Sequence, residues 1–81
     1  MEIKKYYRTR DLSEASFLYA CRKKLIQLDN DDGRIWFMFN DVDSCQKLAD
    51  SFWRREASIN AKEFADAIRT LKDMIFSRLR S

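Results

Sequence analysis

The chain has 81 residues, a formal net charge of +3 and a sequence pI near 9.0. Hydrophobic residues make up 46% of it and charged residues 36%, a balance that excludes an intrinsically disordered chain, and no apolar run is long enough to span a membrane. We expect residues 1–81 to fold as one small domain of modest stability. The first five residues lack the apolar core of a signal peptide, so a cytoplasmic location is the expectation.

The N-terminal part of the chain predicts a strand followed by a helix. Residues 3–9 alternate aromatic or β-branched residues with charged ones, which is typical of a strand. Asp11 followed by Glu14 has the spacing of a capping box, which satisfies backbone amides at a helix start. The apolar spacing behind this cap predicts a helix that runs to about Lys23.

A β-hairpin follows the first helix. Two apolar segments, residues 25–29 and 34–40, flank the acidic turn at residues 31–33, which ends in the chain's single glycine. Because aspartate and glycine supply the backbone angles of a tight turn, the pattern indicates a hairpin. Side chains alternate along the second strand, so one face carries Ile35, Phe37 and Phe39, and the other carries Trp36 and Met38.

The second predicted helix begins at a cap formed by Asp43 with Gln46 and extends to about Arg55. Cys45 lies in this helix and Cys21 in the first one, and neither belongs to a Cys-x-x-Cys motif. We interpret both cysteines as small buried apolar residues, and a disulfide between them is the less favoured alternative.

The last predicted helix carries the clearest amphipathic pattern. Asn60 with Glu63 forms its capping box, and apolar residues then recur at alternating spacings of three and four residues as far as Ile75, in a helix that we expect to reach Leu79. Met74 and Phe76 lie beyond the two edges of this stripe. We therefore expect the apolar surface of this helix to exceed what one small sheet covers.

The elements follow the order β-α-β-β-α-α, which predicts the α+β class. We expect a three-stranded antiparallel sheet with the helices packed on one face. The first strand would pair beside the hairpin.

The composition excludes most catalytic and metal sites. Without histidine, a Ser-His-Asp triad and every histidine-containing zinc site are impossible, and one glycine excludes a P-loop or a dinucleotide fingerprint. The acidic turn does not fit a calcium loop, because Gly33 as the sixth position would place Leu28 first and Phe39 twelfth. A Mg²⁺-dependent nuclease is a remote alternative, because turns and caps require the same side chains, Asp29, Asp31, Asp41 and Asp43. We predict a non-enzymatic protein with no metal and no cofactor.

The predicted sheet face away from the helices suggests a binding surface. The sequence leaves open which face the helices cover; if they cover the face of Ile35, Phe37 and Phe39, then Trp36 and Met38 would lie beside basic and aromatic residues of the first strand. Single-stranded nucleic acid binds such surfaces, since bases stack on the rings and cations hold the phosphates. The residues predicted to bind nucleic acid are Lys4, Arg8 and Arg10 for phosphates, and Tyr6 and Trp36 for bases.

A protein partner is the alternative, and nucleic acid is slightly favoured over it. A protein-binding or inhibitory factor, for instance one of phage origin acting on a host defence protein, would bury an apolar anchor at Met38, Met74 or Phe76. A homodimer closed by the same surfaces is a third alternative. Basic charge around the exposed apolar residues would favour nucleic acid, and mixed charge would favour a protein.

Three blocks of the sequence resemble a known family. They are Tyr7-Arg8-Thr9-Arg10-Asp11-Leu12, Arg34-Ile35-Trp36-Phe37-Met38-Phe39, and the closing pattern Ala61, Phe64, Ala67, Leu71-Lys72 and Ile75. Over nearly its whole length the chain resembles a domain-of-unknown-function family of small bacterial and phage proteins. Members often have a glycine after the first helix, where this chain has Arg22-Lys23-Lys24. The resemblance implies a phage or mobile-element setting and supplies no established activity.

Within the first block, Thr9 and Arg10 have two interpretations. A threonine at the end of a strand can hold the following turn through backbone hydrogen bonds. The pair can instead bind a phosphate near the first helix N-terminus. We favour the structural role, because Asp11 already competes for the same amides.

Overall fold

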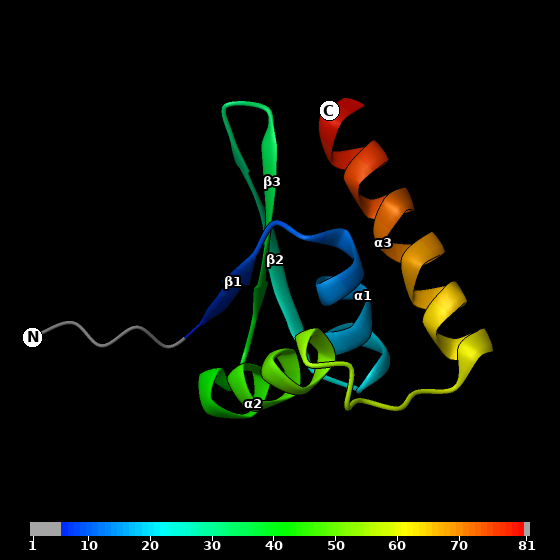
Figure 1. The fold of residues 1–81 in the computed structure, drawn as a ribbon. Helices are drawn as coiled ribbons and strands as arrows, with labels where there is room; N and C mark the ends of the chain where they lie inside the picture. Colours follow the sequence, from blue (N-terminus) through cyan, green and yellow to red (C-terminus); the bar gives the residue numbers. More distant parts are fainter. Residues whose placement is uncertain (1–5, 81) are drawn as a thin grey trace, which may run out of the picture.

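Within residues 6–80, the part of the chain that the computed structural model describes, the backbone forms one three-stranded sheet and three helices (Figure 1). In chain order these are β1 (Tyr7–Thr9), α1 (Leu12–Ala20), β2 (Leu25–Asp31), β3 (Arg34–Phe39), α2 (Val42–Trp53) and α3 (Ala61–Arg80). This order confirms the predicted α+β class and its β-α-β-β-α-α arrangement. The first residues of the predicted N-terminal strand, including the candidate Lys4, lie outside the described residues.

The central strand of the sheet is β3, and the strand order is β1-β3-β2. Both neighbours run antiparallel to β3, with Tyr7 opposite Phe39 in the first pair, so the predicted antiparallel sheet is confirmed. The edge strand β2 carries a bulge between Leu25 and Gln27, where the register shifts. An extra residue in one strand increases the local twist of the sheet.

The hairpin turn consists of Asp32 and Gly33, whose φ angles are 55° and 85°. Positive φ at both positions is the signature of a type I′ turn, which matches the twist of the paired strands. The amide of Gly33 also donates to Asn30 Oδ1 at 2.9 Å. Because such a turn keeps the strands paired up to its edge, β2 extends to Asp31, beyond its predicted end.

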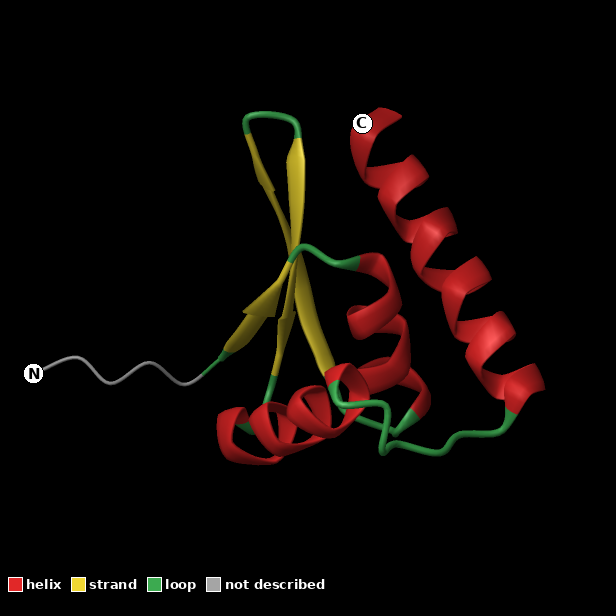
Figure 2. Ribbon diagram, in the orientation of Figure 1, coloured by secondary structure: helices red, strands yellow, loops and turns green. Residues whose placement is uncertain are grey.

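The helix α1 lies between the sheet and the first part of α3, the later part of α3 lies beside β2, and α2 lies across one end of the sheet (Figure 2). Residues 14–18 of α1 are all buried, since this helix packs against α3, α2 and β1. A helix that is covered on every side needs no single apolar stripe. This explains why the spacing in the sequence accounts for only part of its burial.

The hydrophobic core joins the sheet to all three helices. Its buried side chains are Ala15, Phe17, Leu18, Phe37, Phe39, Cys45 and Leu71. The rings of Phe17 and Phe52 stack with centroids 5.1 Å apart, which ties α1 to α2. Cys45 is buried as predicted, whereas Cys21 is half-buried just after α1, and both thiols are free.

Side-chain caps set the helix starts. Asp11 and Asn60 cap α1 and α3 as predicted, each accepting the amide three residues later, at 2.8 and 3.0 Å. The predicted cap at Asp43 is wrong, because α2 begins earlier and Asp41 Oδ1 accepts the amide of Ser44 at 3.3 Å. Asp43 instead lies in the first turn, where its charge interacts favourably with the helix dipole.

The helix α1 ends at Ala20, before its predicted end near Lys23. Arg22 adopts a left-handed conformation with φ of 72°, and the amide of Lys23 donates to Leu18 O at 3.1 Å, which is the pattern of a Schellman cap. The end of α2 is built in the same way around Arg55, with φ of 61°. Glycine is the usual residue at such positions, and this chain has arginine at both.

Replacing Arg55 with glycine should stabilise the protein. The left-handed conformation costs about 1–2 kcal/mol for a residue with a Cβ, and the greater freedom of glycine costs about 0.5–1 kcal/mol. We expect Arg55→Gly to raise the free energy of unfolding in urea by about 0.5–1 kcal/mol. Arg54→Gly is the matched control, because the φ of Arg54 is −83° and a glycine there should be destabilising. Equal effects of the two substitutions would contradict the prediction.

Ser16→Ala should also stabilise the protein. Ser16 is fully buried in α1, and its Oγ has no hydrogen-bond partner among the described residues. Alanine removes the unpaired hydroxyl and is the better helix former, so the free energy of unfolding should rise by about 1 kcal/mol. The exposed Ser13 of the same helix provides the control, since Ser13→Ala should change stability by only a few tenths of that amount. A loss of stability in Ser16→Ala would show that the hydroxyl is needed.

Candidate binding surfaces

One face of the sheet has no helix over it in the described structure (Figure 1). Phe37 and Phe39 are buried beneath the helices, so alternation along β3 places Trp36 and Met38 on the opposite face. This is the division of faces predicted from the sequence. We call this surface the open sheet face, and the cross-strand pairs show that it includes Arg8, Gln27, Asp29, Arg34, Trp36 and Met38.

Trp36 is the centre of the open sheet face. The guanidinium carbon of Arg8 lies 4.3 Å from the centroid of the indole ring, and that of Arg10 lies 5.2 Å from it. Contacts of this kind attract a cation to the ring face and hold it in place. Trp36, which is itself half-buried, therefore positions two arginines that are both exposed to solvent.

The residues predicted to bind nucleic acid are partly brought together. Arg8, Arg10 and Trp36 form one cluster, and Tyr6 lies just before β1 with 41% of its surface exposed. A base cannot stack on the part of the Trp36 ring that the arginines cover. Within residues 6–80, the ring of Tyr6 neither stacks on another aromatic ring nor lies against a cation, which leaves it the more accessible of the two rings.

Charge is divided across the open sheet face. Arg8, Arg10 and Arg34 lie along β1 and the start of β3, whereas Asp29 and Asp31 lie on β2. Arg8 Nη2 is 3.8 Å from Asp29 Oδ2, which places the boundary between the two signs near the middle of the sheet. Trp36 and Met38 are therefore surrounded by mixed charge, with the basic side at β1.

Thr9 has the structural role that the sequence favoured. Its side chain is buried, and its Oγ1 accepts a hydrogen bond from the amide of Asp11 at 3.2 Å. This bond holds the turn between β1 and α1. Arg10 is exposed at the same turn and, with Asp11, Arg34 and Ile35, lines a shallow depression beside the open sheet face.

A buried carboxylate joins three elements, and its role differs from the capping-box role predicted for Glu14, because the Asp11 amide donates to Thr9 Oγ1 instead. Glu14 is only 6% exposed, and its side chain accepts hydrogen bonds from the Tyr7 hydroxyl at 2.5 Å and from Trp53 Nε1 at 2.8 Å. Burial of the phenol, its hydrogen bond to Glu14 and the nearby negative charge raise the pKa of Tyr7 well above its ordinary range. The cluster ties β1 and α2 to the first turn of α1.

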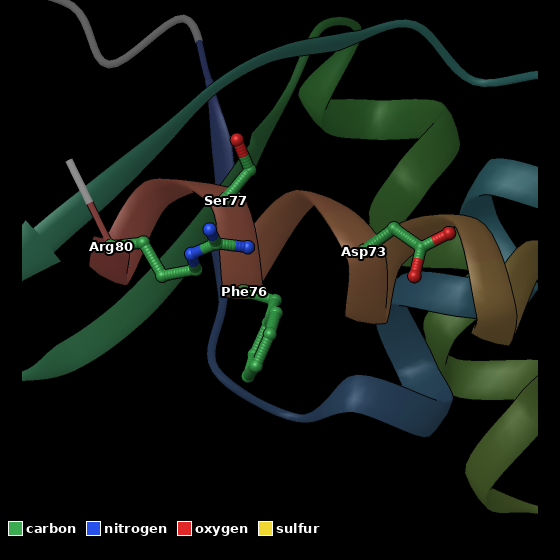
Figure 3. A pocket seen from close by; sticks show the side chains of 4 residues that line it. All are labelled: Asp73, Phe76, Ser77 and Arg80. Atoms are coloured by element: carbon green, nitrogen blue, oxygen red, sulfur yellow. The ribbon is translucent and has the colours of Figure 1, made fainter.

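The residues predicted to bind a protein partner lie in three different places. Met38 is half-buried on the open sheet face, and Met74 is half-buried against the core. Phe76 is 66% exposed near the end of α3, where the guanidinium of Arg80 lies 5.7 Å from its ring centroid (Figure 3). Leu79, in the same turns of α3, is 50% exposed. The apolar surface of α3 does exceed what the fold covers.

Two kinds of site are absent from residues 6–80. No group of three or more cysteine, aspartate or glutamate side chains is placed to hold a metal ion. No helix in this range has the length and apolar character needed to cross a bilayer. The aspartates of the alternative nuclease site are divided between β2 and the start of α2, and Asp41 serves there as the helix cap.

Comparison with known proteins identifies a family and no closer relative. A family model described as a domain of unknown function, DUF5659, matches residues 4–77. No curated protein and no solved structure gives a significant match.

The buried Tyr7–Glu14 contact predicts a loss of stability at alkaline pH. The pKa of Tyr7 is raised in the folded state, whereas a tyrosine in the unfolded chain titrates near its ordinary pKa of about 10. The folded state therefore binds the proton more tightly, and the free energy of unfolding should fall as the pH rises above about 10. Urea titrations between neutral pH and the alkaline range measure this fall.

Tyr7→Phe separates this effect from general alkaline destabilisation. The variant should be less stable at neutral pH, because Glu14 loses a donor, and should show a smaller fall in stability above the tyrosine pKa. Tyr6→Phe, at an exposed tyrosine, is the matched control and should retain the wild-type dependence. An unchanged dependence in Tyr7→Phe would contradict the assignment.

Proposed function

Since the chain belongs to the DUF5659 family, whose description assigns no activity, we propose from the chemistry of its surface that it is a non-enzymatic module that binds single-stranded nucleic acid. The binding surface in this proposal is the β1 side of the open sheet face. The proposal includes a cytoplasmic location and the phage or mobile-element setting that the resemblance implies.

The observation that supports this proposal best is the pair of arginines held against Trp36. Guanidinium groups bind phosphate oxygens through two parallel hydrogen bonds, and fixing them beforehand lowers the entropy lost on binding. Arg8 and Arg10 are exposed and are placed by the same indole ring, so they can contact neighbouring phosphates of one strand. Arg34 adds a third positive charge beside Arg10, at the shallow depression.

In this proposal, the bases stack mainly on the ring of Tyr6. Its ring is exposed beside Arg8, whereas the Trp36 ring already supports the two arginines. Stacking on an aromatic ring tolerates any base, so the binding should show little sequence preference. The carboxylates of Asp29 and Asp31 repel phosphates from the β2 side of the sheet. The bound nucleic acid is therefore expected to lie along β1.

A protein partner is the second candidate, and the mixed charge around Trp36 and Met38 favours it. A partner surface with matched opposite charges could bury both apolar side chains and pair with Arg8 on one side and Asp29 on the other. Such an interface would show weaker salt dependence than phosphate binding. The same titrations therefore distinguish the two candidates.

The test is the affinity for a labelled single-stranded oligonucleotide, measured by fluorescence anisotropy at several salt concentrations. We expect salt-sensitive binding by the wild type, and a loss of about tenfold or more in Arg8→Ala/Arg10→Ala. Removal of two phosphate contacts should reduce the slope of log affinity against log salt by about 1.4, at about 0.7 per contact for a single strand.

Charge-matched controls make this test specific. Lys24→Ala/Lys47→Ala removes two exposed cations elsewhere on the surface and should leave the slope nearly unchanged. Tyr6→Leu should weaken binding without changing the slope, because stacking involves no counterion release. An equal loss of affinity in both double variants would show that binding depends only on the net charge of the protein, which would contradict the proposed site. If the wild type does not bind, the proposal is overturned in favour of a protein partner.

A further inference from the structure

The last turns of α3 present large apolar side chains to solvent. Phe76 is 66% exposed and Leu79 is 50% exposed. At 100° per residue, Phe76 lies about 180° from the buried Ala67, so it points directly away from the core. We call the surface formed by Lys72, Asp73, Phe76, Leu79 and Arg80 the outer face of α3.

The charges on the outer face of α3 lack ion-pair partners within the described chain. Earlier in the helix, Asp66 pairs with Lys62 at 2.7 Å and with Arg69 at 3.5 Å. In contrast, within residues 6–80 Asp73 forms no ion pair, and Arg80 contacts only the ring of Phe76. An unpaired carboxylate and an unpaired guanidinium thus lie near one exposed phenylalanine (Figure 3).

The side chains around Phe76 lie at nearly equal distances before and after it along α3. Asp73, three residues earlier, and Arg80, four residues later, lie about 40–60° to one side of Phe76. Lys72, four residues earlier, and Leu79, three residues later, lie about 40–60° to the other side. One side of Phe76 therefore carries a pair of opposite charges, and the other side carries a pair of side chains with apolar surface. The midpoint of each pair along the helix lies close to Phe76.

We propose that the outer face of α3 binds the same face of a second copy of this chain. In a two-fold arrangement with the helices antiparallel and the axis at Phe76, Asp73 lies opposite Arg80 of the second copy. The aliphatic stem of Lys72 packs on Leu79 of the second copy, and the two Phe76 rings meet at the centre. The Phe76 contact lies on the axis and occurs once, and each of the other contacts occurs twice, as an isologous interface requires.

The size of the surface sets the strength of this association. The helices overlap only over residues 72–80, about 13 Å at 1.5 Å per residue. The contact is therefore smaller than the roughly 1,000 Å² that a stable interface usually buries. The dimer is transient and forms at high protein concentration.

Dimerisation through α3 is independent of nucleic-acid binding. The outer face of α3 points away from the core, and α3 lies on the side of the sheet opposite the open sheet face (Figure 1). Failure of one proposal therefore leaves the other standing. Arg8→Ala/Arg10→Ala should not change the association.

The test is sedimentation velocity of the full chain from low micromolar to near-millimolar concentration. The wild type should shift from monomer mass towards dimer mass, and Phe76→Ser should remain monomeric throughout. Tyr6→Ser, at an exposed aromatic residue on the other side of the molecule, is the matched control and should associate like the wild type.

Charge reversal tests the geometry itself. Asp73→Arg and Arg80→Asp should each weaken the dimer, because each brings like charges together, and the double variant Asp73→Arg/Arg80→Asp should restore it. These positions are exposed, so circular dichroism should show an unchanged fold. A wild type that stays monomeric, or a double variant that is no better than either single variant, would overturn the proposal.

Discussion

The fold depends on one constraint, which is that the middle of α1 is buried on every side. Its residues 14–18 are all buried, and the sheet, α2 and α3 each pack against a different part of it. A domain of this size buries only about 60–65% of the surface of its unfolded chain, so few side chains are available for a core. Placing this helix in the middle gives β1, α2 and α3 the same packing partner. The outer surfaces of the sheet and of α3 are then left without a partner within the described chain.

Burying the middle of α1 also buries the carboxylate of Glu14. An ionised group away from water is costly unless donors surround it. The hydroxyl of Tyr7 and the indole N–H of Trp53 supply two donors, and they come from the strand before α1 and from the end of α2. The indole of Trp53 is thus anchored to the buried carboxylate, although 57% of the residue is exposed. The polar cluster thus fixes how three elements meet at one point.

Local chemistry made much of the fold predictable. The turn at Asp32 and Gly33 and the caps at Asp11 and Asn60 each depend on a few adjacent residues, and each is found as predicted. The cap of α2 was misplaced because Asp41 and Asp43 compete for one role, and only the path of the chain after β3 decides between them. The contacts of Arg8 with Trp36 and Asp29 require the register of three strands, and the bond from Trp53 to Glu14 spans 39 residues. No local sequence pattern predicts the contacts of Arg8 or the bond from Trp53 to Glu14.

The bulge in β2 has a consequence for the behaviour of the protein in concentrated solution. An edge strand of seven residues offers a row of backbone groups on which another chain can grow a cross-β ribbon. The shifted register between Leu25 and Gln27 twists the first part of this edge, and Asp29 and Asp31 bring negative charge to the rest. The β2 edges of two copies of the chain would repel each other, and their twisted backbones would not align for hydrogen bonding. Crowding of the folded protein should therefore not seed fibrils from this edge.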